Sequence, residues 1–228
     1  MRIITVLIAA VAALAFVLPA PAQTAAGSSS IVNIEPSLKE KFYMGGGFQL
    51  DIPSFKTYNE TIEGEDVGVN DFDNTWGLQL KAGYFINDYL AIEGLFQYHR
   101  NFEWTSDEYS DPVLGTVSGK IEVSGFSLSV NAKGFLPLGQ FRPYAVAGLG
   151  YARGKAKGTG TYDPPVGPTV SYSDSETDSG PMGRIGIGCD VLFNDSFGLE
   201  GEVAYNIGMS DIDYVRFVAL SAGVLIML

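Results

Sequence analysis

The chain contains few residues that form covalent cross-links or bind transition metals. Its 228 residues include one cysteine, Cys189, and one histidine, His99. A single cysteine excludes an intrachain disulfide, and these two residues are too few for a zinc site of the cysteine and histidine type. The sequence therefore predicts no metal site and no cofactor.

Positive charge is also scarce. The chain has 14 Lys and Arg residues against 26 Asp and Glu residues, and its formal net charge is −12 at pH 7. Nucleic-acid-binding domains carry basic patches that neutralise phosphates. We therefore expect no nucleic-acid partner.

A long apolar run occurs only at the start of the chain. Ile3 to Leu18 follows Arg2, and small residues in the A-x-A pattern end at Ala22. This order predicts a secretory signal peptide over residues 1–22. A membrane anchor is the alternative, but the run is short for a helix that needs about 20 apolar residues to cross a bilayer. The Ala/Gly/Ser-rich stretch that follows predicts a flexible periplasmic leader over residues 23–41.

The remaining apolar residues are spread through alternating segments. The composition is 46% hydrophobic and 12% aromatic, and from residue 42 onward apolar side chains alternate with small or polar ones. This period of two predicts β-strands. Eight strands are expected, over residues 42–52, 76–86, 90–104, 120–136, 141–155, 182–193, 197–207 and 214–228.

The connectors between these segments alternate strictly in length. Short turns are predicted at residues 87–88, 137–140 and 194–196, and polar loops at 53–75, 105–119, 156–181 and, shorter, 208–213. This order is typical of an antiparallel barrel with one rim in the periplasm and the other outside. We therefore expect the termini and short turns in the periplasm. No proline is expected in the middle of a strand.

Two architectures fit the alternation: a soluble sandwich or barrel that buries its apolar face, and a barrel that turns this face to lipid. The second face is crowded with Gly, Ala and Ser, which suits a narrow interior. Aromatic residues also gather beside the turns, as they do at membrane interfaces. The sequence thus favours an all-β fold, an eight-stranded antiparallel up-and-down transmembrane β-barrel in residues 42–228.

Charged residues of both signs share the predicted interior face. They form an expected lumen charge network of structural ion pairs: Lys81, Glu93, Lys133, Arg184, Asp190, Glu200 and Glu202. Glu200 and Glu202 have the spacing of a paired-carboxylate site, but buried carboxylates need cationic partners and the ion-pair interpretation is favoured. The run Gly45 to Gly47 lacks the Lys-Ser/Thr of a phosphate loop, and predicts close packing inside the first strand.

Three segments together resemble a known family. They are residues 83–93 (GYFINDYLAIE), 131–139 (NAKGFLPLG) and 142–151 (RPYAVAGLGY). They resemble the outer membrane protein β-barrel domain family, the small OmpA-type and opacity-type barrels often described as porin family proteins. The resemblance implies a cell outer membrane location, with outer membrane lipid, lipopolysaccharide and the barrel assembly machinery as partners. Such barrels usually end in an aromatic residue, whereas this chain ends in Leu228.

Three functions remain open at this point. The first is a non-enzymatic barrel with a structural or surface-interaction role and a narrow, side-chain-filled lumen; the second is a channel for small solutes. The third is a lipid-modifying enzyme, for which His99 is the single histidine candidate and would need an oriented partner. We favour the first and predict no catalytic residue.

The long connectors are acidic. The first loop contains Glu60, Glu63, Glu65, Asp66, Asp71 and Asp73 against Lys56, and Asp174, Glu176 and Asp178 recur in the third. These residues could bridge divalent cations or bind a surface ligand. A solvated charged surface is the favoured interpretation.

Overall fold

The computed structural model describes residues 38–54, 59–62, 65–68, 73–105, 109–111, 115–213 and 215–228. The predicted signal peptide and residues 23–37 of the predicted leader lie outside this part of the chain. Within it, no helix has the length and apolar character needed to cross a membrane.

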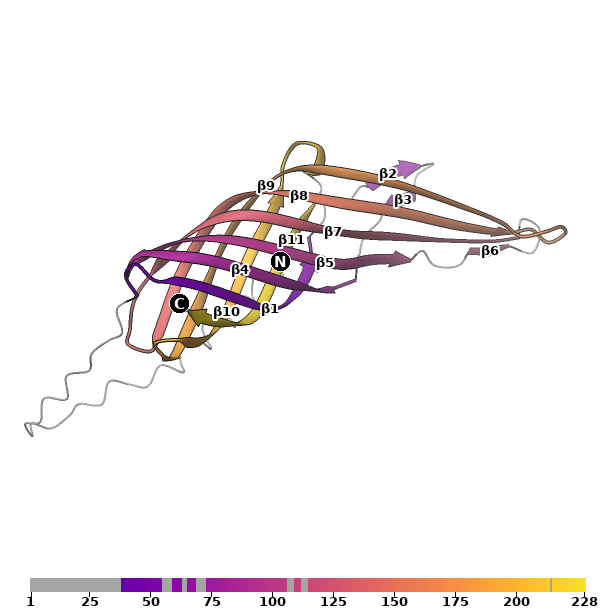
Figure 1. Ribbon diagram of the computed structural model, residues 1–228. Helices are drawn as coiled ribbons and strands as arrows, with labels where there is room; N and C mark the ends of the chain where they lie inside the picture. Colours follow the sequence, from indigo (N-terminus) through magenta and orange to yellow (C-terminus); the bar gives the residue numbers. More distant parts are fainter. Residues whose placement is uncertain are drawn as a thin grey trace, which may run out of the picture. The chain divides into compact units, whose positions relative to one another are not determined.

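Eight strands pair antiparallel with both of their neighbours and close into a barrel (Figure 1). They are β1 (Phe42–Pro53), β4 (Thr75–Asn87), β5 (Leu90–Thr105), β7 (Gly115–Phe135), β8 (Phe141–Asp163), β9 (Val170–Asn194), β10 (Phe197–Gly208) and β11 (Arg216–Met227). Each pairs with the next along the chain, and β1 pairs with β11 to close the ring. The predicted eight-stranded antiparallel barrel is therefore confirmed.

Short elements occupy three of the predicted loops. A separate hairpin of β2 (Asn59–Ile62) and β3 (Glu65–Gly68) lies between β1 and β4. β6 (Tyr109–Asp111) pairs with the start of β7, and a 3₁₀ turn, η1 (Ser210–Ile212), connects β10 to β11.

The hairpin of β8 and β9 differs most from the sequence prediction. Residues 156–181 were expected to form a loop, but β8 pairs with β9 out to Tyr162 and Val170. β7 begins at Gly115 instead of residue 120 and pairs with β8 along the same length. The loop prediction is wrong because polar residues on both faces of a segment indicate only that it contacts water. A strand that projects from the barrel contacts water on both faces, as a loop does. Only residues 164–169 form an irregular connection.

Two prolines lie inside strands, against expectation, and both are at points where a neighbouring strand ends. The carbonyl of Pro181 in β9 accepts the Met209 N–H at 2.9 Å, beyond the last pair of β9 with β10. The carbonyl of Pro143 in β8 accepts the Leu136 N–H at 2.8 Å, just past the end of β7. The nitrogen of a β residue faces the same side as its carbonyl, so neither proline removes a ladder hydrogen bond.

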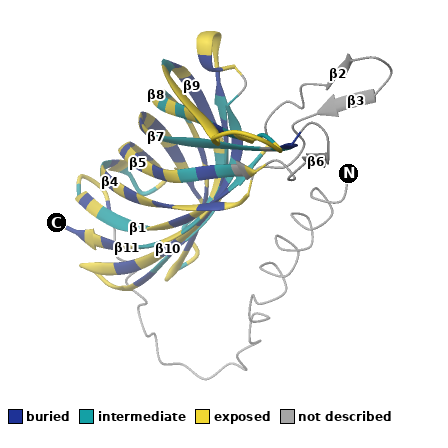
Figure 2. Ribbon diagram, turned by 90° about the vertical axis from the view of Figure 1, so that its right-hand side faces the viewer, coloured by how far each residue is buried: buried dark blue, intermediate teal, exposed yellow. Residues whose placement is uncertain are grey.

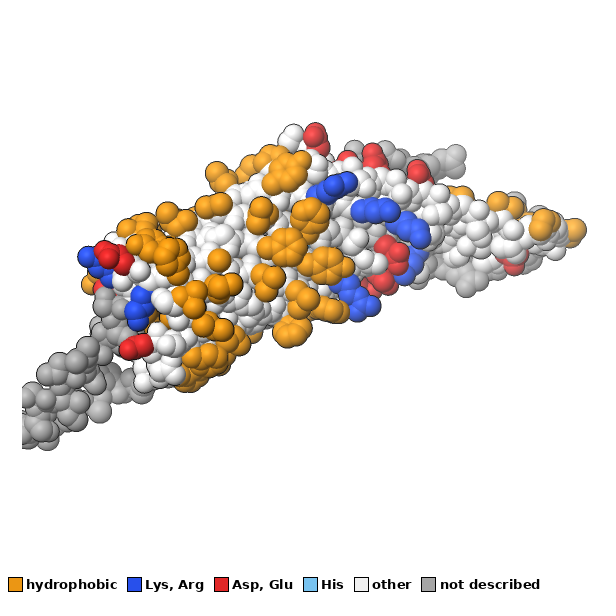
Figure 3. All heavy atoms as spheres, in the orientation of Figure 1, with side chains coloured by type: hydrophobic (Ala, Val, Ile, Leu, Met, Phe, Trp, Pro, Cys, Tyr) orange, Lys and Arg blue, Asp and Glu red, His pale blue; other side chains and the backbone are white. Residues whose placement is uncertain are grey.

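The two faces of each strand are those that the alternation predicts. Buried and exposed positions alternate along the barrel strands, as the bands in Figure 2 show. The outward positions are large and apolar; Phe48 is 69% exposed, Leu80 62% and Leu149 70%. On the face that Figure 3 shows, these side chains form an apolar belt across the barrel body. Exposed apolar surface on this scale indicates contact with lipid.

Residues just before β1 pack into the barrel at the end that carries the short turns. The side chain of Leu38 is fully buried, and its N–H donates to Asp88 Oδ1 at 2.8 Å. The N–H of Glu40 donates to the carbonyl of Phe85 at 2.8 Å. The last residues of the predicted flexible leader, 38–41, are thus part of the packed structure.

Candidate functional site: the barrel lumen

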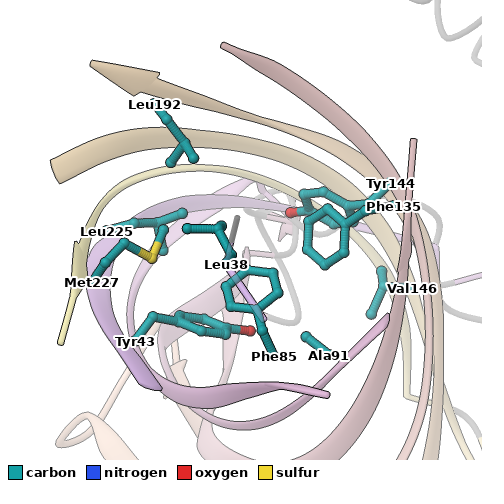
Figure 4. Close-up of a cluster of buried hydrophobic side chains, with 10 residues drawn as sticks. All are labelled: Leu38, Tyr43, Phe85, Ala91, Phe135, Tyr144, Val146, Leu192, Leu225 and Met227. Atoms are coloured by element: carbon teal, nitrogen blue, oxygen red, sulfur yellow. The ribbon is translucent and has the colours of Figure 1, made fainter. Parts of the chain in front are cut away.

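An aromatic plug fills the lumen at the short-turn end (Figure 4). Four rings contact one another in series across the barrel: Tyr43 with Phe85 at 5.1 Å between centroids, Phe85 with Phe135 at 5.3 Å, and Phe135 with Tyr144 at 5.2 Å. Aliphatic residues complete the plug: Leu38, Ala91, Val146, Leu192, Leu225 and Met227. Ring spacings of this kind are those of attractive aromatic pairs.

Arg142 lies against this plug, and the sequence did not predict it as a lumen residue. Its guanidinium is 5.1 Å from the Phe85 ring and 5.2 Å from the Phe135 ring, and Nη2 donates to the Asp88 carbonyl at 2.6 Å. The Gly- and Ala-rich sequence of β8 leaves its two faces indistinguishable by composition, so Arg142 and Tyr144 could not be assigned to the lumen. The register of β8 with β9 places them there.

Lysine–glutamate pairs occupy the next level of the lumen. Lys133 Nζ lies 2.6 Å from Glu93 Oε2 and 3.0 Å from Glu200 Oε2. Lys81 forms a second ion pair with Glu200. All four side chains are 2% exposed or less, so the site satisfies each buried charge with an opposite one, as burial requires.

A further ion pair, between Arg184 and Glu202, lies on the β9 and β10 side. Arg184 Nη1 also donates to Gln97 Oε1 and Asn206 Oδ1, both at 3.1 Å. Tyr144 of the plug donates its hydroxyl proton to Glu202 Oε2 at 2.8 Å. Tyr43 does the same for Glu93 Oε2 at 2.9 Å, so plug and ion pairs form one connected network.

Asp190 is the least connected member of the predicted set. It is buried beside Glu200, its register partner on β10. Its Oδ1 atom has no hydrogen-bond partner among the residues that the structure describes. The structure thus brings all seven predicted residues into the lumen and joins six of them by ion pairs.

A polar layer around His99 lies above the ion pairs. His99 Nδ1 is 2.8 Å from Asp51 Oδ2, and Gln49 Nε2 donates to Asp51 Oδ1 at 2.9 Å. Gln97 Nε2 donates to Gln49 Oε1 at 2.7 Å. Gly77 makes room for this layer, because a Cβ there would lie 3.0 Å from the Gln49 side chain.

Asp51, His99 and Ser127 are the residue types of a nucleophilic triad, but their geometry does not suit that chemistry. His99 Nε2 is 3.4 Å from Ser127 Oγ, and this hydroxyl is also 3.4 Å from Gln97 Oε1. Acyl transfer further needs donors aimed at the developing oxyanion. The strand around Ser127 pairs with β5 and β8, which uses its backbone N–H groups in the ladder. The arrangement is therefore better suited to fixing side chains than to attacking an ester.

A cavity of about 50 Å³ lies at the mouth above this layer, with room for a few water molecules. His99, Phe102, Ile212 and Phe217 are among its lining residues. Among the described residues, no group of three or more His, Cys, Asp or Glu side chains could hold a metal ion. Of the acidic residues predicted in loops, Asp174, Glu176 and Asp178 lie in β9. The side chains of Lys56, Glu60, Glu63, Glu65, Asp66 and Asp71 lie outside the described part of the chain.

Comparison with known proteins gives a family and several similar structures. The model of the family described as outer membrane protein beta-barrel domain matches residues 8–225. Comparison with curated protein sequences gives no match. Ail, the attachment invasion locus protein of Yersinia pestis, is 17% identical with a TM-score of 0.50, over 83% of this chain and 99% of Ail. Neisserial surface protein A is 15% identical with a TM-score of 0.50, over 81% of this chain and 96% of its own. At these identities the similarity concerns the fold.

Proposed function

The chain belongs to the outer membrane protein β-barrel domain family, and from that premise we propose that it is a non-enzymatic barrel with a structural or surface-interaction role. Its place is the cell outer membrane, as for the family and the similar structures. The proposal adds that the lumen is closed to solutes and that the barrel serves to hold its outer strands at the cell surface.

The observation that carries this proposal is the filling of the lumen. The aromatic plug closes the short-turn end, the ion pairs of Lys81, Lys133 and Arg184 cross the middle, and the His99 layer lies above them. Eight strands leave an interior only wide enough for side chains. A solute would have to break several buried ion pairs to pass, which favours a closed barrel over the channel alternative.

Planar-bilayer conductance of the refolded protein tests the proposal. We expect no steady conductance from the parent. Tyr144→Ala, which removes a ring of the plug and a hydrogen bond to Glu202, should produce intermittent current. Tyr151→Ala is the matched control, because Tyr151 lies on the same strand, is 53% exposed and faces lipid. Steady ohmic channels in the parent would replace this proposal with the solute-channel function.

Partners follow from the same proposal. Outer membrane lipid and lipopolysaccharide would contact the apolar belt, and the barrel assembly machinery would receive the chain through its last strand. That strand ends at Met227, and the N–H of the next residue, Leu228, donates to the Phe42 carbonyl at 2.8 Å. A surface ligand of the acidic outer residues is a further proposed partner.

A further inference from the structure

The outward face of β8 changes chemistry in steps along its length. Ala145, Ala147 and Leu149 come first, Tyr151 follows, and then Arg153, Lys155 and Lys157. All three basic residues are exposed, on the same face as the lipid-facing residues before them. This order, apolar then aromatic then basic, is the one that a strand shows where it leaves the hydrocarbon core of a membrane.

Neighbouring strands show the same boundary at the same height. Tyr98 of β5 pairs with Phe126 of β7, which pairs with Arg153 of β8. One step beyond this row, Arg100 is exposed on β5 and lies 5.3 Å from the Trp76 ring. Further along β7, Lys120 reaches Glu103 at 3.2 Å and Glu122 at 2.7 Å.

We define the basic band as the five basic residues at or beyond the row of Tyr98, Phe126 and Arg153. They are Arg100, Lys120, Arg153, Lys155 and Lys157. Figure 3 shows Lys and Arg side chains gathered beside the apolar belt, on the side toward the β8–β9 hairpin. Two carboxylates lie among them: Glu103 and Glu122 both form ion pairs with Lys120, and Glu122 is also the register partner of Lys157. In a chain with nearly twice as many acidic as basic residues, this local excess of cations over carboxylates is a feature that the fold produces.

The acidic residues of the same hairpin face the other way. Asp174, Glu176 and Asp178 of β9 pair with Gly158, Ala156 and Gly154 of β8, which belong to the inward face. The outward positions of β9 opposite the basic residues are Ser175, Thr177 and Ser179. Within the β8–β9 hairpin, strand alternation therefore separates the charges into a basic outward face and an acidic inward face, and on the adjacent β7 the outward Glu122 lies opposite Lys157.

We propose that the basic band binds the phosphate groups of lipopolysaccharide in the outer leaflet. This inference rests on the proposed function, which places this end of the barrel at the cell surface. Lys155 and Lys157 are two residues apart on one face of β8, which separates them by about 6.6 Å along the strand. Arg153 on the same strand and Lys120 on β7 flank this pair within about two strand spacings. Several cations can thus contact one phosphorylated sugar, while the aromatic row beneath contacts its acyl chains.

The acidic inward face supports the choice of a lipid ligand over a free anion. A soluble anion would approach from the mouth, where Asp174 and Glu176 are exposed and repel it. A lipid phosphate reaches the band sideways from the membrane and meets five cations against two carboxylates, Glu103 and Glu122, both of which are paired with Lys120. Basic residues near an anionic membrane surface each add attraction that falls off over a Debye length.

Binding of lipid A to the full barrel in phosphatidylcholine nanodiscs tests the inference. Hexa-acylated lipid A carrying both phosphates is titrated against the parent and against the triple variant Arg153→Gln, Lys155→Gln, Lys157→Gln. We expect the triple variant to bind at least about tenfold more weakly. The control variant Asp174→Asn, Glu176→Gln, Asp178→Asn changes as many charges on the inward face and should bind at least as tightly as the parent.

Two further arms identify the ligand chemistry. Dephosphorylated lipid A should bind the parent and the triple variant equally weakly, and inorganic phosphate at millimolar concentration should not compete with lipid A. Lys155→Arg with Lys157→Arg should retain binding. Equal binding of lipid A to parent and triple variant, or equal binding of both forms of lipid A to the parent, would overturn the inference. Conductance of the same samples separates its failure from failure of the closed-barrel proposal.

Discussion

Lys133 illustrates how a single buried residue holds the lumen together. Its ammonium contacts Glu93 and Glu200, and lies 4.5 Å from the centre of the Tyr144 ring. A buried ion pair adds little net stability over an apolar pair, but a buried charge without its partner costs a great deal. The lumen residues are therefore more constrained as a set than any one of their contacts suggests.

Removal of Arg184 should destabilise the barrel strongly. Arg184→Ala leaves the buried Glu202 with Lys133, 4.0 Å away and shared with Glu93 and Glu200, as its remaining cation. We expect a loss of about 3–5 kcal/mol in the free energy of unfolding. Urea titration of the refolded protein in lipid vesicles measures this loss. Arg216→Ala, at the start of β11 and partly exposed, is the control and should change it by about 0.5 kcal/mol or less. Equal effects of the two variants would contradict the ion-pair account.

Gly47 is the second residue at which a small change should matter. A Cβ at this position would lie 2.6 Å from the Gly223 Cα on β11. Gly47→Ala should therefore cost about 1–3 kcal/mol, because backbone cannot move aside as a side chain can. Gly201→Ala is the matched control: nothing lies within 4 Å of its Cβ position, so stability should stay equal or rise. The thermal midpoint in detergent ranks the two; similar midpoints would contradict close packing at the seam.

The Glu122 carboxyl outside the membrane belt should titrate at unusually low pH. The hydrogen bond from Lys120 lowers the pKa of Glu122, and Glu122 in turn raises the pKa of Lys120. A lowered pKa means that this contact stabilises the fold above the ordinary carboxyl range and is lost as pH falls through the lowered value. Carboxyl-resolved NMR should show Lys120→Met returning the Glu122 pKa toward its ordinary value; an unchanged titration would assign the shift to another group.

At the scale of elements, the projection formed by β7, β8 and β9 is separable from the barrel. Beyond Arg153 and Ser179, β8 pairs with β7 and β9, while β7 also pairs with β5 as far as Lys120 and with β6. Every pair below them belongs to a closed ring. Such a three-stranded sheet adds surface without adding lumen. The two faces of the β8–β9 hairpin differ in charge, so the positions of its acidic and basic residues are constrained even where every residue is polar.

Shortening this projection should leave the barrel intact. Replacing residues 158–174 with Asn-Gly joins Lys157 to Ser175 through a two-residue hairpin turn, which this dipeptide favours. We expect the unboiled protein to keep its fast migration on gels and its thermal midpoint to remain near that of the parent. A large fall in the midpoint would show that the projection also stabilises the barrel.

The sequence predicts the strands whose two faces differ in composition and misses the segments whose two faces are alike. Alternation with period two places Leu78, Gln79 and Lys81 correctly, because one face of β4 contacts lipid and the other the lumen. It fails on β8 near Arg142, where Gly and Ala occupy both faces. It also fails on residues 156–181, where both faces contact water and no contrast remains. The contacts among lumen residues depend on register across the barrel, which no local pattern contains.

At the scale of the whole molecule, the short turns should face the periplasm and the β8–β9 tip the outside. In a Cys189→Ser background, Val166→Cys places a thiol at a tip position that is 92% exposed, and Ser196→Cys places one in a short turn. A membrane-impermeant maleimide should label Val166→Cys on intact cells and Ser196→Cys only after lysis. Labelling in the reverse order would invert the topology.

The pairing of β1 with β11 has a consequence for how the barrel folds. Every other pair in the ring joins strands that are neighbours along the chain, whereas this seam joins Gly47 to Gly223. An ion pair in the lumen also joins residues that are far apart in sequence: Lys81 lies on β4 and its partner Glu200 on β10, 119 residues later. Contacts of high sequence separation form late, so an open sheet carries these charges unneutralised. Lys133 with Glu93 and Arg184 with Glu202 join neighbouring strands and can pair in an open sheet. Closing the seam and pairing Glu200 with Lys81 and Lys133 are instead a single cooperative event, and a partly assembled barrel has the benefit of neither.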